Sequence, residues 1–285
     1  MNKKLLYLLL AALIITTNTT GYAAFFLDHG LDLKGMQYGG AYTANPEGSG
    51  ALYWNVANLS FQNKTELYTA YSKLFSEVND FSLLMNGNIR GIGSFGIAYY
   101  RSGVENISYT DNYGNPIGSG NFSFVNQAYY LGYSCNYNET QALGITAKGI
   151  TQTAGTIGQK KYLSCDFGYK IKLSGTLALG ILLQDVVSTS PKELYGIYRC
   201  GISYDLAVLK FNIDYLSHQL FKKTYINLGA GYEPFDFFKI RGGYNAYEKN
   251  CYLGISIIIN ELGFDYLTSE QELGIIQKFG LSIRI

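Results

Sequence analysis

The stretch Leu209-Lys210-Phe211-Asn212-Ile213-Asp214-Tyr215 decides the fold class, because apolar and polar residues alternate along it without a break. Successive side chains of a β-strand point to opposite faces of the sheet, so this stretch predicts a strand with one apolar and one polar face. The same alternation returns at the end of the chain, in Lys278-Phe279-Gly280-Leu281-Ser282-Ile283-Arg284-Ile285. We therefore predict an all-β protein built from two-faced strands.

About fourteen segments can form such strands, and an even number of antiparallel strands is the rule for single-chain barrels of the bacterial outer membrane. Beyond residue 23 the sequence contains no apolar run as long as a membrane-spanning helix needs. A membrane protein of this sequence would therefore cross with strands. We expect strands at 64–73, 81–90, 92–101, 122–135, 141–151, 162–171, 175–185, 194–204, 207–215, 223–233, 236–245, 250–259, 261–268 and 277–285.

Two-faced strands also build β-sandwiches, so alternation alone leaves that fold open. The connections favour a barrel, because they alternate in length, and long loops on one side with short turns on the other are typical of outer-membrane barrels. We therefore expect a transmembrane antiparallel β-barrel over residues 64–285. The long connections are 102–121, 152–161, 186–193 and 269–276, and the short turns lie at Gly91, 136–140, 172–174, Pro234 and Asn260.

The composition agrees with a barrel in a lipid bilayer. Charged residues make up 15% of the chain, against about 25% in soluble domains. The chain has 27 Tyr, 16 Phe and 33 Gly but only 4 Pro, and aromatic rings gather at both membrane interfaces of such barrels. The formal net charge of +1 argues against a nucleic-acid partner, which would require a strongly basic surface.

The N-terminus predicts export. Met1-Asn2-Lys3-Lys4 is a short positive region, Leu5 to Ile15 is a nearly unbroken apolar run, and Gly21-Tyr22-Ala23 places small residues before a cleavage site. This is the pattern of a Sec-type signal peptide, and the apolar run is short for a helix that crosses about 30 Å of hydrocarbon. We expect residues 1–23 to be the signal peptide and the mature protein to lie in the bacterial outer membrane. Its general partners would be outer-membrane lipid and the barrel-assembly machinery.

The polar face of the predicted strands carries many ionised side chains, and in a closed barrel this face lines the lumen. Two interpretations stay open. One is a path for protons or ions, and the other, which is commoner, is an ion-paired lumen that stiffens a narrow barrel. The candidate lumen-lining residues are Lys148, Arg199, Glu233, Arg241, Asp265 and Arg284, and the same face is expected to carry Arg90, Asp166, Lys170, Lys210, Asp214, Lys239 and Lys278.

The four cysteines lie in four different predicted strands, in a compartment where disulfides are allowed. By strand parity all four share the apolar face. Cysteines that point into lipid from non-adjacent strands cannot meet, so we interpret them as small apolar residues rather than as disulfides or metal ligands. They are Cys135, Cys165, Cys200 and Cys251.

No motif predicts catalysis or a cofactor. The stretch Gly91 to Gly96 matches G-x-G-x-x-G, but the nucleotide-binding form of that motif opens a helix, and residues 92–101 continue as a strand. His29 and His218 are the two histidines, and no nucleophile, base and orienting group can be assembled around either. We therefore expect no enzyme activity and no cofactor.

A glycine-rich segment lies between the predicted signal peptide and the first strand. It contains Leu33-Lys34-Gly35-Met36-Gln37-Tyr38-Gly39-Gly40-Ala41-Tyr42-Thr43-Ala44 and then Ser49-Gly50-Ala51-Leu52-Tyr53-Trp54-Asn55-Val56-Ala57-Asn58-Leu59. These two stretches resemble the N-terminal signature of the PorV/PorQ family within the wider FadL-like outer-membrane group. Shorter stretches similar to that family follow at 115–118, 143–148, 240–244 and 262–266. The motif residues are Gly35, Gly39, Gly40, Ala41, Ala51, Leu52, Tyr53, Trp54, Asn55 and Ala57.

The resemblance implies a fourteen-stranded barrel whose N-terminal segment, residues 24–63, lies in or beneath the lumen as a plug. Glycines let a chain fold tightly against a wall, and Tyr53 and Trp54 could wedge it there. The plainer alternative is that this segment only seals and nucleates the barrel. Val56 stands where the family usually has proline. Valine has a backbone N–H donor and a free φ angle, so the sequence does not determine whether the local turn is the same.

The resemblance also bounds the function. PorV-like members act with type IX secretion, so the leading hypothesis is a secretion or surface-assembly partner of exported proteins that works through its outer loops and barrel mouth. The alternative is a FadL-like channel for hydrophobic small molecules, which would need an apolar pocket at the outer mouth and a lateral opening. A third hypothesis is a purely structural barrel. The charged inward face mildly disfavours a wide apolar conduit.

Overall fold

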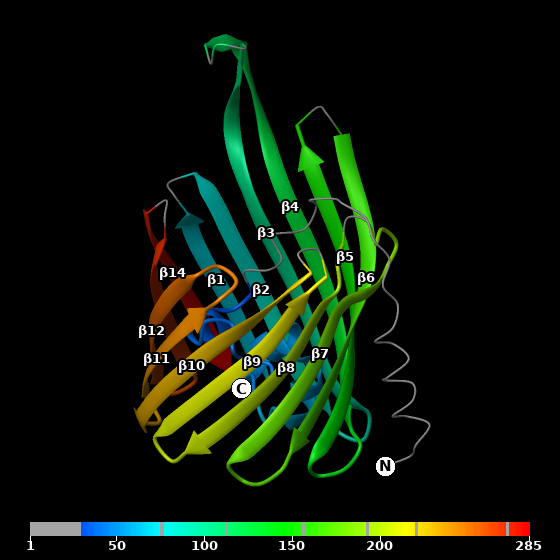
Figure 1. Ribbon diagram of the computed structural model, residues 1–285, viewed down its shortest axis with the longest axis vertical. Helices are drawn as coiled ribbons and strands as arrows, with labels where there is room; N and C mark the ends of the chain where they lie inside the picture. The colour runs from blue at the N-terminus through cyan, green and yellow to red at the C-terminus, as the bar shows by residue number, and fades with distance from the viewer. Residues whose placement is uncertain are drawn as a thin grey trace.

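The computed structural model shows a closed β-barrel with short helices inside it (Figure 1). The predicted signal peptide, residues 1–23, lies outside the described residues. No helix in the described part of the chain is long and apolar enough to cross a membrane. The structure describes residues 30–74, 77–111, 113, 115–155, 158–191, 194–219, 222–271 and 274–285.

Fourteen antiparallel strands form the wall in the order of the sequence, and β1 pairs with β14 to close it. Across this seam Glu66 lies opposite Arg284 and Ser72 lies opposite Lys278. Closure removes both free edges of the sheet, which lets backbone donors and acceptors at membrane depth pair within the wall. The predicted transmembrane barrel is confirmed. The strands are β1 (Glu66–Leu74), β2 (Val78–Ile89), β3 (Gly93–Thr110), β4 (Pro116–Asn136), β5 (Gln141–Ala154), β6 (Gly158–Lys172), β7 (Leu177–Ser188), β8 (Ile197–Leu206), β9 (Leu209–His218), β10 (Lys223–Phe235), β11 (Phe238–Asn245), β12 (Asn250–Ile259), β13 (Leu262–Gln271) and β14 (Gly274–Arg284).

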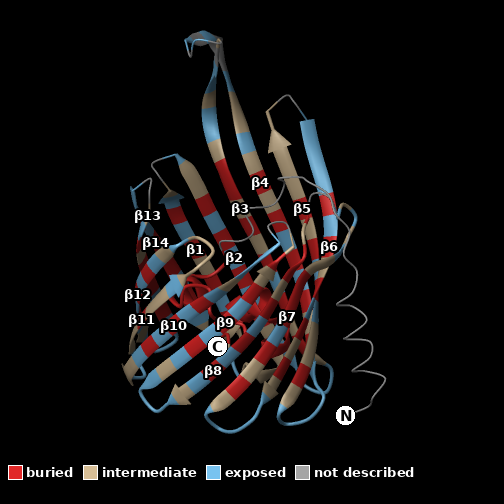
Figure 2. Cartoon of the chain, in the orientation of Figure 1, coloured by how far each residue is buried: buried red, intermediate tan, exposed pale blue. Residues whose placement is uncertain are grey.

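Each strand has the two faces that the sequence predicts, and Figure 2 shows them as alternating buried and exposed bands along the wall. In β9, Phe211, Ile213 and Tyr215 point outward and are 44%, 50% and 49% exposed, whereas Asn212 and Asp214 are buried. Large apolar side chains on the outside and polar ones inside are the reverse of a soluble protein. The arrangement fits a wall that contacts lipid hydrocarbon.

The cysteines lie on the outward face, as predicted. Cys135, Cys200 and Cys251 are exposed, Cys165 is half-buried, and all four are free. No group of three or more metal-ligating side chains occurs among the residues that the structure describes.

The prediction of a long loop at 102–121 is wrong, because most of these residues form strands. β3 pairs with β2 as far as Gly103 and then continues to Thr110, paired only with β4, which begins at Pro116. This two-stranded hairpin projects well beyond the other connections in Figure 1. The residues of the hairpin are largely Gly, Ser and Asn, so no apolar alternation marks them, but the two arms satisfy each other's backbone hydrogen bonds.

Two of the other long connections are also shorter than predicted, because the strands extend into them. β5 ends at Ala154 and β6 begins at Gly158, while β13 ends at Gln271 and β14 begins at Gly274. The third, between β7 and β8, keeps its length but lies at 189–196. The prediction for Arg90 is wrong. It is exposed in the turn that follows Ile89, the last residue of β2, and so does not face the lumen.

The chain from residue 30 to residue 61 runs inside the barrel, and we call it the luminal segment. It forms α2 (Leu33–Gln37), η2 (Gly48–Gly50), α3 (Ala51–Trp54) and η3 (Val56–Phe61). Figure 1 shows it as the blue ribbon enclosed by the strands. Of the predicted 24–63 segment, residues 24–29 lie outside the described residues.

Candidate functional site: the luminal segment and the inner wall

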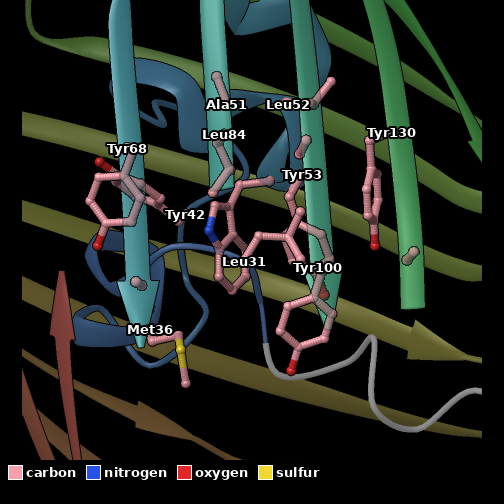
Figure 3. Close-up of a cluster of buried hydrophobic side chains, with 14 of the residues drawn as sticks. Leu31, Met36, Tyr42, Ala51, Leu52, Tyr53, Tyr68, Leu84, Tyr100 and Tyr130 are labelled. Atoms are coloured by element: carbon pink, nitrogen blue, oxygen red, sulfur yellow. The ribbon is translucent and has the colours of Figure 1, made fainter. Parts of the chain in front are cut away.

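All ten motif residues of the luminal segment are buried. Figure 3 shows Leu52 and Tyr53 of this segment among side chains from the wall, including Tyr68, Tyr100 and Tyr130. These residues belong to one apolar cluster inside the barrel. The structure therefore brings together the two glycine-rich stretches that the sequence singled out.

Trp54 is the centre of the segment's own packing. Its ring meets Tyr53 edge-on at 4.9 Å between centroids and Tyr42 at 6.3 Å. Its indole Nε1 donates to the carboxylate of Asp32. A Cβ added at Gly35 would lie 2.1 Å from the Trp54 ring, so only glycine fits beneath the indole.

Asp32 is fully buried within the segment. Burial raises its pKa to about 6, against the lowering effects of Lys34 and of the Trp54 hydrogen bond. Its second oxygen, Oδ2, has no hydrogen-bond partner in the described part of the chain. The protonated form of Asp32 is thus favoured well above the pH at which a carboxyl group in water ionises.

The wall receives the segment through inward-facing glycines. A Cβ added at Gly243 of β11 would lie 2.1 Å from the carbonyl carbon of Tyr38. On the other side of the contact, Gly39 has a φ of +66°, and its own added Cβ would lie 2.6 Å from the backbone nitrogen of Tyr244. Backbone therefore packs directly on backbone, which leaves no passage at this point of the wall. Further inward glycines in contact with the segment are Gly96, Gly132, Gly144, Gly168, Gly180, Gly201, Gly229, Gly231 and Gly254.

Asn55 and Val56 form the turn between α3 and η3. The Asn55 side chain donates to the carbonyls of Thr43 at 2.9 Å and Tyr169 at 3.0 Å, and it accepts from the amide of Ala57 at 3.2 Å. Val56 is the first residue of η3. Proline is tolerated at the first position of a helix because the N–H there has no helical acceptor, so this position can hold either valine or proline without losing the turn.

Asp214 of β9 anchors the middle of the segment. Its Oδ2 accepts from the backbone amides of Tyr42 and Thr43, each at 3.0 Å. A carboxylate that accepts hydrogen bonds from two backbone amides holds the main chain of the segment. This contact does not depend on which side chains the segment carries.

Predicted lumen-lining residues form two ion-pair clusters in contact with the segment. In the first, Glu66 binds Lys34 at 2.9 Å and Arg284 at 2.7 Å. In the second, Glu47 of the segment lies 2.6 Å from Lys210 and 3.4 Å from Lys239. Burial alone would raise the pKa of Glu47, but the neighbouring Lys210, Lys239 and Arg241 hold it well below its usual range.

The second cluster continues through the wall residues. Glu233 lies 3.1 Å from both Lys210 and Lys239 and 3.5 Å from Arg241. Arg241 also donates to Gln37 of the segment at 2.8 Å and to Ser256 at 2.6 Å. Ser256 in turn donates to Asp265. Paired charges tie the segment to the wall, which supports the stiffening interpretation over an open ion path.

Lys148 and Arg199 lie apart from those clusters. Lys148 pairs with Asp166 at 2.7 Å and with Asp185 at 2.6 Å. Asp185 has a φ of +54° and lies in a bulge of β7, where the register against β6 shifts between Cys165 and Phe167. The bulge turns the Asp185 carboxylate toward the lumen, whereas regular alternation along β7 would place it on the outer face.

The inner wall of β3 to β6 carries a group of aromatic and aliphatic side chains beside Tyr53 of the segment, next to the ion pair of Lys148 and Asp166. Interior faces of water-filled barrels are polar, so a patch of this kind is unusual for a simple pore. We call it the aromatic inner face, and it consists of Tyr100, Ala128, Tyr130, Ile150 and Tyr162 together with Leu194 of the β7–β8 connection.

A polar cavity of about 350 Å³ opens at the end of the barrel that carries the short turns. Lys64, Glu233, Lys239 and Arg284 line it. It lies on the side where Glu47 and its lysine partners seal the segment against the wall.

Sequence reasoning missed several residues that hold the segment. Glu47, Glu66 and Asp32 carry no motif. Asp214 was predicted to face the lumen, but nothing in the sequence indicated that it binds backbone amides 171 and 172 residues away. Only the inward parity of charged residues could have drawn attention to this group.

Comparison with known proteins gives matches by structure only. No protein-family model matches the chain, and no curated protein matches it. The crystal structure of the toluene transporter TbuX of Ralstonia pickettii matches with a TM-score of 0.64 at 13% identity, over 92% of this chain and 98% of that chain.

Two further solved structures are similar. The Pseudomonas putida toluene transporter TodX matches with a TM-score of 0.60 at 13% identity, and a Pseudomonas aeruginosa FadL homologue with a TM-score of 0.59 at 10% identity. Each of these two matches covers 94% of this chain and 98% of the matched chain. At these identities the likeness shows the fold. The protein is a transmembrane β-barrel of FadL-like architecture whose lumen is occupied by its own N-terminal segment.

Proposed function

We propose that this chain is an outer-membrane barrel that binds hydrophobic small molecules and passes them across the membrane. The observation that carries the proposal is the aromatic inner face, where Tyr100, Tyr130 and Tyr162 project inward from three strands beside Ile150. Apolar and aromatic linings with few polar groups are typical of sites for apolar ligands. The structurally similar TbuX and TodX are named toluene transporters, which supports the same ligand class here.

The charged lumen does not conflict with this function. The ion pairs of Glu47 and Glu66 join the segment to the wall, whereas the aromatic inner face lies on β3 to β6 beside Tyr53. Lys148 lies opposite Tyr130 in this face, but its charge is paired with Asp166 and Asp185. An apolar ligand would contact the aromatic face without displacing those pairs.

Trp54, the single tryptophan, provides the test because it packs on Tyr53 at the base of the aromatic face. Purified mature protein in mild detergent should change its tryptophan emission on titration with toluene, and apolar molecules should co-purify and appear in mass spectra. Ile150→Asn should weaken the toluene response at least tenfold. Ile276→Asn, the same change at a buried inward position of β14 outside the apolar cluster, is the matched control. An unchanged response in Ile150→Asn would contradict the proposal.

The second candidate function is a PorV/PorQ-type role in protein secretion or surface assembly. The projecting β3–β4 hairpin favours it, because Tyr113 at its tip is 90% exposed and Ile117 is 54% exposed. Large apolar side chains on a protruding element are suited to contact another protein.

The two functions separate in one experiment. Val104 pairs with Phe124, so residues 105–123 can be replaced by an Asn-Gly turn without disturbing the barrel below. Exported proteins that co-purify with the native chain and are lost with the shortened hairpin would support the secretion role. Toluene binding that survives the shortening, with no co-purifying protein, would support the channel. If the native chain binds no toluene and no exported protein co-purifies with it, the remaining interpretation is a purely structural barrel.

A further inference from the structure

Arg199 is a buried cation with no carboxylate at ion-pair distance among the described residues. The carboxylate of Asp214 on β9 interacts with its charge over a longer distance. Arg199 is 4% exposed, and its Nε donates to Oε1 of the uncharged Gln184 at 2.9 Å. Its guanidinium carbon lies 5.3 Å from the centre of the Trp54 ring. By contrast, Lys148 and Arg241 each form ion pairs. A buried charge is costly unless an opposite charge compensates it. Asp214 also accepts from the amides of Tyr42 and Thr43, so a counter-ion in direct contact would still stabilise Arg199.

A small cavity lies against Arg199, between the luminal segment and β8 to β11. Its volume is about 10 Å³, which is close to the space that one water-sized particle occupies. None of the residues around it carries a carboxylate. They are Gly40, Trp54, Ile197, Arg199, Leu216, His218, Asn227, Asn245 and Tyr247.

Two side-chain amides point their donors toward this cavity. The Oδ1 of Asn227 accepts from the amide of Ala246 at 3.0 Å, and the Oδ1 of Asn245 accepts from the amide of Tyr247 at 3.0 Å. With both oxygens occupied by backbone, the two Nδ2 groups are left to face the other way. Both converge on Gly40, where an added Cβ would lie 3.1 Å and 3.5 Å from them.

We propose that this cavity is a binding site for a single-atom anion, which in the cell would be chloride. A guanidinium and two amide groups supply N–H donors from three sides, and such donors stabilise negative charge. Space for about one water-sized particle favours a single-atom anion over a carboxylate or phosphate group. The anion would neutralise Arg199 and would lie against the backbone of Gly40, so it would fasten the luminal segment to β8, β10 and β11.

Bromide provides a direct test because it replaces chloride and scatters anomalously. Crystals of the mature protein grown without halide and soaked in sodium bromide should show an anomalous peak within hydrogen-bonding distance of Arg199, Asn227 and Asn245. A water molecule at this position that bromide does not replace would overturn the proposal.

Stability in solution provides a second test on the full mature chain. The temperature at which heat-modifiable gel mobility is lost should rise with chloride concentration when gluconate keeps the ionic strength constant, by about 2–4 °C for each tenfold increase above the dissociation constant. No dependence on chloride in the native protein would also overturn the proposal.

Variants separate this site from a general salt effect. Asn227→Asp keeps the acceptor for Ala246 and places a carboxylate oxygen beside Arg199, so it should abolish the chloride dependence while the barrel still folds. Arg199→Gln should abolish it as well. Arg101→Gln removes an arginine whose ion pair with Glu105 lies outside the site, and it should leave the dependence unchanged. A full chloride response in Asn227→Asp would count against the assignment.

Discussion

The Nζ of Lys34 lies 2.9 Å from the Oε2 of Glu66, and the two side chains are 3% and 1% exposed. The same Oε2 lies 2.7 Å from the Nε of Arg284. One carboxylate on β1 therefore joins the luminal segment to the seam where β14 closes the barrel. The segment and the wall are stabilised by the same contact.

Glu66→Gln should destabilise the protein by about 3–5 kcal/mol, because it leaves the charges of Lys34 and Arg284 without their partner in a buried site. The free energy of unfolding in urea, followed by gel mobility, measures the effect. Glu105→Gln makes the same change in an exposed ion pair with Arg101 and should cost at most about 1 kcal/mol. Equal losses in the two variants would show that the seam pair has no special role.

Gly243→Ala should prevent the segment from seating, because the new Cβ would lie 2.1 Å from the carbonyl carbon of Tyr38. Gly242→Ala is a matched control, since the nearest atom to its Cβ would be the carbonyl oxygen of Tyr252 at 3.7 Å. We expect limited proteolysis to cut residues of the luminal segment in Gly243→Ala but not in Gly242→Ala. A protected segment in both variants would refute the tight backbone contact.

Asp32 should make stability depend on pH. Its pKa is about 6 in the folded protein, above the unfolded value near 3.9, so the folded state binds more protons between these values. Its contribution is therefore present at low pH and is lost as pH rises from about 4 to about 6, with a total of about 3 kcal/mol.

Asp32→Asn tests this sign, because asparagine keeps the oxygen that accepts from Trp54 and cannot ionise. The difference in unfolding free energy between native protein and variant should move in favour of the variant as pH rises through this range. A difference that stays constant from pH 4 to pH 7 would mean that Asp32 titrates normally.

Val56→Pro should be tolerated, with a change in stability within about 1 kcal/mol, because Val56 is the first residue of η3 and Asn55 before it is extended. Ala57→Pro should be destabilising, since the Ala57 amide donates to Asn55 Oδ1 at 3.2 Å. Thermal stability of the two purified variants compares them directly. A severe loss in Val56→Pro would show that proline at this position requires a different turn.

Much of the fold was predictable because strand alternation is a local property. The alternation over residues 209–215 predicts both faces of β9. The same alternation predicts that Lys148, Arg199 and Arg241 face inward and the four cysteines outward, and the structure has them so. The β3–β4 hairpin was missed because its arms carry no apolar alternation. Pairing between residues such as Ile107 and Phe122 depends on backbone hydrogen bonds, which leave no trace in side-chain type.

The sequence by itself determined the barrel, the polarity of its two faces and the presence of a distinctive glycine-rich segment, because each of these follows from the order of neighbouring residues. Only the tertiary structure decided what the inward charges do. Glu66 meets Lys34 and Arg284 across 32 and 218 positions of sequence, and closure of the barrel brings them together. Asp214 binds main-chain amides, for which no residue type is diagnostic. The attachment of the motif around Trp54 to the wall thus depends on long-range pairing that no local pattern encodes.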